Sequence, residues 1–170
     1  NTGVRLGSDW NGTVKLTGAT TALELSSLGN AHSSIDLGSF NHTLADGAHV
    51  IDSALMGSGS LTLNEGSKLT LNGDCSNWSG DIIGQVELEL TEGGTMGGNV
   101  QVDSLSIGEN SSSAFEGNLT TKGTITVADN ATLLLNGNTK LGGTIENADS
   151  GTVKLAGQIT VDVENFESST

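Results

Sequence analysis

The 170-residue sequence contains no proline and no tyrosine, and only 3% of its residues are aromatic. With so few aromatic side chains, the core must be built from Val, Ile and Leu, which form thin aliphatic layers. Glycine is nevertheless abundant, at 25 residues, which is about twice its usual share. Abundant glycine without proline excludes collagen and proline-rich linkers. This composition suits a narrow β-coil better than a bulky sandwich core.

Cysteine occurs once, at Cys75, so no disulfide framework holds the fold. No cation flanks it, and we therefore expect an inert thiol. No apolar run approaches the 18 or so residues of a transmembrane helix, and we expect no membrane insertion. Because the chain begins at Asn1 instead of methionine, we expect a processed segment.

Positive charge is also scarce, with 6 basic against 20 acidic residues and a net charge of −14. The basic residues are scattered and form no patch that could neutralise phosphates, which excludes nucleic-acid binding. An anionic membrane surface would repel the chain. The acidity is typical of a soluble, exposed protein.

A five-residue cassette recurs along the chain: glycine, a small polar residue, then apolar, polar and apolar residues. Residues 12–16 and 151–155 are identical, Gly-Thr-Val-Lys-Leu. Looser copies begin at Gly59, Gly66, Gly123 and Gly157. One strand this short cannot bury its apolar face, whereas a stack of such strands can. The cassette therefore predicts a solenoid.

Alternation of apolar and polar residues persists from Val14 to Val163 and predicts short strands separated by Asn-, Gly-, Asp- and Ser-rich turns. Regular strand spacing fits a sandwich or a barrel as well as a β-helix. Closely spaced cassettes and the lack of a long crossover connection favour the β-helix over the sandwich and the barrel. We predict one all-β domain over residues 1–170, a parallel β-helix (β-solenoid), with a β-sandwich as the alternative. Residues 39–58 and 108–118 interrupt the alternation, and we expect protruding loops there.

Residues 9–14 (Asp-Trp-Asn-Gly-Thr-Val) and 77–82 (Asn-Trp-Ser-Gly-Asp-Ile) share a Trp-x-Gly-x-apolar form before a strand. With the Gly/Thr/Ser/Asn-rich strands, this motif resembles the autotransporter-associated β-strand repeats of bacterial passenger proteins. The resemblance covers roughly two thirds of the chain. It implies a secreted or surface-displayed, right-handed parallel β-helix that acts as a passenger-like module.

Carboxylates are the candidate catalytic groups. Glycosidases need paired carboxylates, but the local Asn-Asp, Asp-Asp and Gly-His-Gly motifs of polysaccharide-cleaving β-helices are absent. Aspartic proteases need two carboxylates that share a proton, each in an Asp-Thr/Ser-Gly turn. Asp149 begins one such turn, which would require a symmetric dimer, and Asp9 lies beside an aromatic residue that can hold a substrate. An ordinary turn aspartate is the commoner explanation for Asp149, because Gly151 starts a cassette.

Other ligand-binding signals are few. His42, Asp46 and His49 lie close together in the sequence, but their spacing matches no zinc motif, so we predict no metal site and no cofactor. The motif residues Trp10 and Trp78 are the candidate binding residues.

Two functions remain open at this point. The first is a structural or adhesive module that contacts host glycans or glycoproteins through a flat Thr/Asn/Ser face. The alternative is a secreted hydrolase of a host mucin-type glycoprotein, an aspartic-type protease that uses Asp149 or Asp9.

Overall fold

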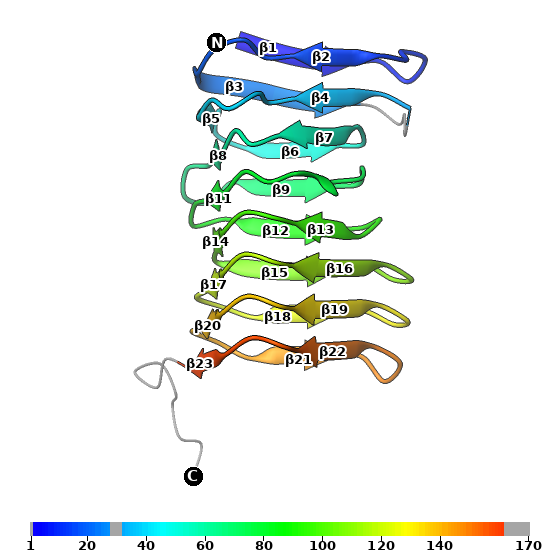
Figure 1. The fold of residues 1–170 in the computed structure, drawn as a ribbon, viewed down its shortest axis with the longest axis vertical. Coiled ribbons are helices and arrows are strands. Elements are labelled where there is room, and N and C mark those ends of the chain that lie inside the picture. The colour runs from blue at the N-terminus through cyan, green and yellow to red at the C-terminus, as the bar shows by residue number, and fades with distance from the viewer. Residues whose placement is uncertain (1, 28–31, 162–170) are drawn as a thin grey trace.

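The structure is a computed structural model that describes residues 2–27 and 32–161. Its described residues form strands, turns and bends but no helix, so no helix is available there to span a membrane. The strands pair in parallel and stack into a three-sided coil (Figure 1). The predicted parallel β-helix is thus confirmed, and the sandwich alternative is excluded.

Each side of the coil is one stack of strands. Face 1 contains β5 (His42–Leu44), β8 (Leu61–Thr62), β11 (Ile82–Ile83), β14 (Val100–Val102), β17 (Leu119–Thr121), β20 (Thr139–Leu141) and β23 (Ile159–Val161). Face 2 contains β1 (Thr2–Leu6), β3 (Thr20–Ser27), β6 (Ala48–Ile51), β9 (Lys68–Leu71), β12 (Glu87–Leu90), β15 (Ser104–Ile107), β18 (Ile125–Val127) and β21 (Ile145–Asn147). Face 3 contains β2 (Thr13–Lys15), β4 (Ser34–Asp36), β7 (Ala54–Gly57), β10 (Asn77–Trp78), β13 (Gly94–Met96), β16 (Ser112–Phe115), β19 (Thr132–Leu135) and β22 (Thr152–Leu155).

The long β3 strand turns the corner between two faces, so faces 1 and 2 form one continuous 15-stranded sheet. Face 3 consists of two 4-stranded sheets, β2–β4–β7–β10 and β13–β16–β19–β22. Chain segments about 20 residues apart lie in register, as Leu119, Thr139 and Ile159 do on face 1. This regular offset places equivalent residues of successive coils directly above one another.

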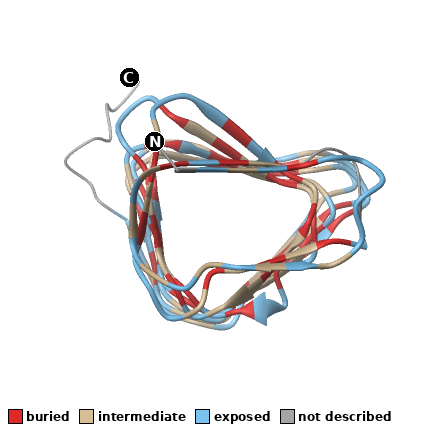
Figure 2. Ribbon diagram, turned by 90° about the horizontal axis from the view of Figure 1, so that it is seen from above, coloured by how far each residue is buried: buried red, intermediate tan, exposed pale blue. Residues whose placement is uncertain are grey.

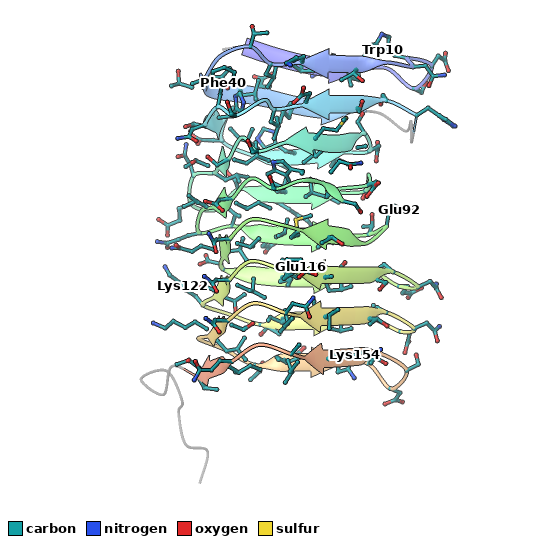
Figure 3. All side chains as sticks on the ribbon, viewed as in Figure 1. Trp10, Phe40, Glu92, Glu116, Lys122 and Lys154 are labelled. Atoms are coloured by element: carbon teal, nitrogen blue, oxygen red, sulfur yellow. The ribbon has the colours of Figure 1, made fainter. Side chains whose placement is uncertain are left out.

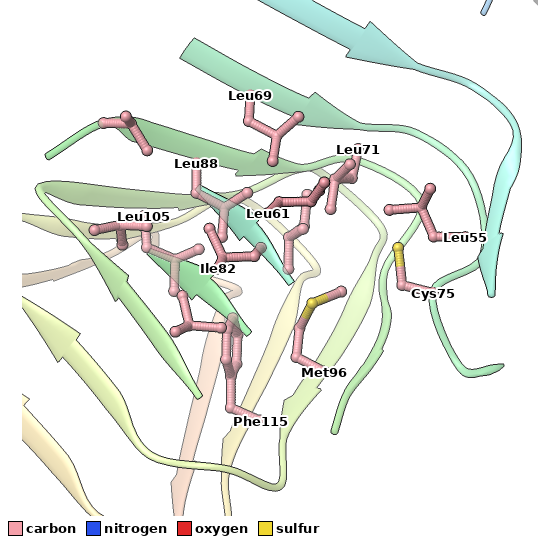
Figure 4. Close-up of a cluster of buried hydrophobic side chains, with 14 of the residues drawn as sticks. Leu55, Leu61, Leu69, Leu71, Cys75, Ile82, Leu88, Met96, Leu105 and Phe115 are labelled. Atoms are coloured by element: carbon pink, nitrogen blue, oxygen red, sulfur yellow. The ribbon is translucent and has the colours of Figure 1, made fainter. Parts of the chain in front are cut away.

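Apolar residues of the alternating pattern point into the coil. The cross-section is roughly triangular, with buried and exposed positions alternating along its sides (Figure 2). Leu61, Ile82, Val100 and Leu119 form one buried column from face 1. Leu88, Leu105 and Phe115 come from the other two faces into the same interior (Figure 4). Burial of these aliphatic layers supplies most of the driving force for folding.

Glycine is required where the chain enters face 1. Gly80, Gly98, Gly117 and Gly137 stack on one another, and a Cβ atom at each would collide with the carbonyl oxygen of the glycine one coil before. We call this column the glycine ladder; it begins at Gly59 and ends at Gly157. Only glycine lets successive backbones approach this closely.

The two predicted protruding loops are wrong. Residues 39–58 contain β5, β6 and β7, which form a coil, and residues 108–118 contain β16. The alternation was hidden because polar residues occupy inward positions there. His42 and Ser113 are buried beside apolar neighbours, and the Nε2 atom of His42 lies 2.9 Å from the carbonyl oxygen of Leu37.

Candidate functional site

The two candidate catalytic carboxylates lie at opposite ends of the solenoid (Figure 1). Asp9 is in the turn between β1 and β2, and Asp149 is in the turn between β21 and β22. Both side chains are exposed. Because the whole stack of coils separates them, the two carboxylates cannot share a proton within one chain.

Asp149 belongs to a turn that three successive coils repeat. Residues 109–110, 129–130 and 149–150 each form a two-residue turn at the same corner between faces 2 and 3. The hydroxyl of Ser150 donates to Oδ1 of Asp129 at 2.8 Å and accepts from the backbone N–H of Asn130 at 3.0 Å. The Asp-Ser-Gly sequence therefore forms part of a corner that stacks on the corner of the preceding coil. This agrees with the interpretation of Asp149 as an ordinary turn residue.

The two tryptophans differ in exposure. Trp10 is 37% exposed and lies on the first coil (Figure 3). Trp78 is 2% exposed, and its indole N–H donates to the carbonyl oxygen of Gly59 at 2.8 Å. Trp78 takes the inward position of β10, where Asn77 takes the outward one. The prediction of Trp78 as a ligand-contacting residue is therefore wrong, whereas Trp10 stays accessible.

Two of the three histidines, His42 and His49, are structural residues of the core, whereas His32 is exposed. The Nδ1 atom of His42 lies 3.1 Å from the hydroxyl of Thr20. The ring nitrogens of His49 lie 3.2 Å from the carbonyl oxygen of Leu25 and 2.9 Å from that of Ala45. No group of three or more metal-ligating side chains occurs among the described residues.

Cys75 is buried, and burial is the main cause that raises its pKa to about 12, with a smaller contribution from the negative charge of Asp74. The thiolate is the reactive form of cysteine. At neutral pH the thiol is therefore protonated and unsuited to nucleophilic chemistry.

A ladder of amide and carboxylate side chains follows the glycine ladder at the entrance to face 1. The Oδ1 atom of Asp81 accepts the backbone N–H of Asn99 at 2.6 Å. The Oδ1 atom of Asn99 accepts the backbone N–H of Asn118 at 3.1 Å. The Oδ1 atom of Asn118 in turn accepts the backbone N–H of Asn138 at 3.2 Å. These bonds satisfy corner N–H groups and fix each side chain on the outer surface.

Next to this ladder, the outer side of face 1 is hollowed. A hollow of about 250 Å³ is lined by Asp81, Ile83, Gln101, Asn118 and Thr120, with neighbouring residues of the same strands. A second hollow, of about 320 Å³, shares Ile83 and Gln101 with the first and extends to Thr62 and Asn64. A third, of about 360 Å³, shares Asn64 with the second and extends to Thr43 and Asp46. We call these three neighbouring hollows, which share lining residues, the polar groove.

Several polar groups in the groove are available to a ligand. The ladder uses the Oδ1 atom of Asn118, and within the described residues no hydrogen bond is recorded for its amide Nδ2. The side chains of Gln101 and Thr120 likewise have none there. Ile83 adds one exposed apolar side chain between them. The groove thus offers donors, acceptors and a small apolar surface, which suits a polyhydroxylated ligand.

Sequence reasoning missed these residues, although a signal was present. Gly-Asp-Ile at 80–82 returns as Gly-Asn-Val at 98–100, Gly-Asn-Leu at 117–119 and Gly-Asn-Thr at 137–139. The repetition of an Asx residue after each glycine of the ladder indicates a stacked side-chain ladder.

Comparison with known protein families, with curated proteins and with solved structures finds no match to this chain. The fold defines its class as a parallel β-solenoid. The resemblance to autotransporter passenger repeats stays a prediction.

Proposed function

We propose that this chain is a structural and adhesive module of a secreted or surface-displayed bacterial β-solenoid, and that its polar groove binds host glycans or glycoproteins. The observation that carries the proposal is the polar groove on face 1, lined by Asp81, Gln101, Asn118 and Thr120. The net charge of −14 is consistent with an exposed, soluble protein.

The chemistry of the groove fits sugar hydroxyls, which both donate and accept hydrogen bonds. The amides of Gln101 and Asn118 supply N–H donors, the carboxylate of Asp81 supplies acceptors, and the hydroxyl of Thr120 supplies both. Ile83 can pack against the C–H groups of a sugar ring. Adjacent strands hold these groups at the spacing of a sheet, about 4.8 Å. Because these groups stand on strands of a rigid sheet, little backbone freedom is lost on binding.

The groove is shallow and continues along several coils, from Thr43 to Thr120. Such a surface suits an extended oligosaccharide or several neighbouring glycans of one glycoprotein better than a single sugar. Weak contacts at successive hollows can then add up through effective concentration.

The test is calorimetric titration of mucin-type oligosaccharides into the chain and its Gln101→Ala and Thr120→Val variants. We expect each variant to bind about fivefold more weakly, as the loss of one hydrogen bond of about 1 kcal/mol implies. Thr126→Val is the matched control, because Thr126 points outward from face 2 of the same coil. Equal affinity of all four proteins, or no binding at all, would contradict the proposal.

The hydrolase alternative is tested separately, by a cleavage assay. Cleavage of mucin or casein at pH 4 to 7 that is lost in Asp149→Asn or Asp9→Asn would favour an aspartic-type protease. Since one chain keeps these two carboxylates at opposite ends, that outcome would require residues from two chains.

A further inference from the structure

The chain carries six copies of Asn-x-Ser/Thr, the acceptor motif for N-linked sugars in secreted proteins, at Asn11, Asn41, Asn77, Asn110, Asn118 and Asn130. Residues two apart in an extended segment point to the same side, so the asparagine and the Ser or Thr face outward together. All six asparagines are exposed, and the middle residue is buried in every copy except the first, where it is Gly12. The coil thus presents each motif at its outer surface.

The side-chain amide nitrogen of each of these six asparagines is free. The sugar is attached to the Nδ2 atom, so that atom must be accessible. Among residues 2–27 and 32–161, no hydrogen bond is recorded for Nδ2 of any of the six. Where such a side chain does bond, it uses Oδ1, as in Asn41, which accepts the hydroxyl of Ser60 at 2.7 Å. The reactive nitrogen is therefore left to solvent in every copy.

Asparagines outside the motif behave differently. Their Nδ2 atoms donate to a carboxylate or a backbone carbonyl in Asn64, Asn72, Asn99, Asn136 and Asn147. In the part of the chain that the structure describes, Asn138 is the one exception. A Ser- and Thr-rich composition can produce the motif by chance, but it gives no reason for free amides to coincide with it. The coincidence points to a use for the free nitrogens.

Asn110 and Asn130 form a matched pair of these sites. They take equivalent turn positions in successive coils, with φ values of 58° and 56°. Within the described residues, neither Oδ1 nor Nδ2 of either side chain has a recorded hydrogen bond. The third residues of the two motifs, Ser112 and Thr132, are register partners on face 3, and no hydrogen bond is recorded there for their hydroxyls. Both motifs are thus fully available to an enzyme.

The corner that holds this pair lies away from the polar groove. In the triangular cross-section, the corner between faces 2 and 3 is opposite face 1 (Figure 2). Figure 1 shows the turns from β15 to β16 and from β18 to β19 at one edge of the view and the face 1 strands at the other. A sugar on Asn110 or Asn130 would leave the groove open, whereas a sugar on Asn118, which lines the first hollow, would cover it.

We propose that Asn110 and Asn130 are N-glycosylation sites, at which a transferase specific for Asn-x-Ser/Thr attaches a sugar to the folded coil. The donor is a sugar phosphate linked to a nucleotide or a lipid. Nδ2 forms a bond to the anomeric carbon of the sugar, and the bond between that carbon and the phosphate oxygen breaks. The electron pair of the broken bond stays with the phosphate, which also takes up the proton released by Nδ2. This inference does not depend on the ligand of the polar groove.

The test incubates the folded 170-residue chain with a soluble Asn-x-Ser/Thr glucosyltransferase and UDP-glucose, followed by peptide mass spectrometry. A tryptic digest of the same chain is the unfolded reference. We expect a hexose on Asn110 and Asn130 in both samples, at similar occupancy. Ser112→Ala and Thr132→Ala should each abolish modification of their own asparagine alone. Modification of the digest only would overturn the proposal, because the folded coil would then hide the sites. Absence of the hexose from both samples would overturn it too, because the motifs would not be acceptors.

Asp74→Ser is the matched control, because it completes the motif at Asn72, an asparagine at the same corner whose amide is bound. Nδ2 of Asn72 donates to Oδ1 of Asp52 at 2.6 Å, and its Oδ1 accepts the hydroxyl of Thr91. We expect Asn72 of the folded variant to be modified about fivefold more slowly than Asn110, the factor that one net hydrogen bond represents. The two should react at comparable rates in the digest. Equal rates in the folded variant would overturn the inference, because a free amide would then not select the site.

Discussion

From β11 onward the coils are nearly uniform, whereas the coils that end at β10 are irregular. In the later half, Asn110 and Asn130 take equivalent turn positions at the corner between faces 2 and 3, with φ values of 58° and 56°. Asparagine tolerates this left-handed conformation better than most residues. In the earlier half, the pairing of β3 with β5 shifts register between Thr20 and Leu23.

The interiors of the two halves differ in the same way. The later half is filled mainly by aliphatic side chains, several of them stacked on partners of similar size, as Leu105 is on Ile125 and Ile107 on Val127. The earlier half buries His42, His49 and Trp78, each with a hydrogen bond to a backbone carbonyl. The regular half thus stacks mainly aliphatic residues on one another, whereas the irregular half fills its interior with large or polar side chains that need hydrogen-bond partners.

Trp78→Ala should have the largest effect, because it removes the largest buried side chain of the irregular half. We expect the free energy of unfolding to fall by about 4 kcal/mol. Chemical denaturation monitored by far-UV circular dichroism measures this loss. Trp10→Ala is the control, since Trp10 is partly exposed, and it should cost less than about 1 kcal/mol. Equal losses in both variants would contradict the proposal that Trp78 fills the interior of the irregular coils.

Gly137→Ala tests the regular half. The new Cβ atom would collide with the carbonyl oxygen of Gly117, so neighbouring coils must separate. A loss of about 3 kcal/mol in unfolding free energy is expected. The control is Gly18→Ala, where a Cβ atom meets nothing within 4 Å. That change should be neutral or stabilising by about 0.5 kcal/mol, since alanine restricts the unfolded chain.

Cys75 gives a smaller, pH-dependent effect near the boundary between the halves. Its pKa rises from 9.0 to about 12 in the folded chain, mainly because of burial. The unfolded thiol therefore ionises first, so its contribution to stability is full below pH 9 and decreases as the pH rises towards 12. At pH 10.5 we expect wild type to lose about 2 kcal/mol relative to pH 8 compared with Cys75→Ala. Urea denaturation at the two pH values measures the difference, and parallel behaviour of both proteins would show that the thiol is accessible to water.

Much of the fold was predictable because the cassettes mark both the strands and their inward residues. The identical residues 12–16 and 151–155 do form equivalent strands on one face. The predicted loops were wrong because a buried His42 looks like a surface residue until its carbonyl partner is known. The inward orientation of Trp78 could not be predicted either, because a strand of only two residues shows no alternation of its own.

The polar groove could not be predicted, because it depends on register between coils of unequal length. Ile82 pairs with Val100 and Val100 with Leu119, which are different sequence separations. Only the three-dimensional stack brings Asp81, Gln101 and Thr120 to one hollow. The sequence predicted a flat polar face, but not which strands compose it.

The most direct test of the proposed function is nuclear magnetic resonance titration of the isotope-labelled chain with mucin-type oligosaccharides. We predict that the amide shifts cluster on face 1 between Thr43 and Thr120, and that the side-chain amides of Gln101 and Asn118 move most. Shifts confined to the end turns around Asp9 and Asp149, or no shifts at any concentration, would contradict a glycan-binding groove on this solenoid.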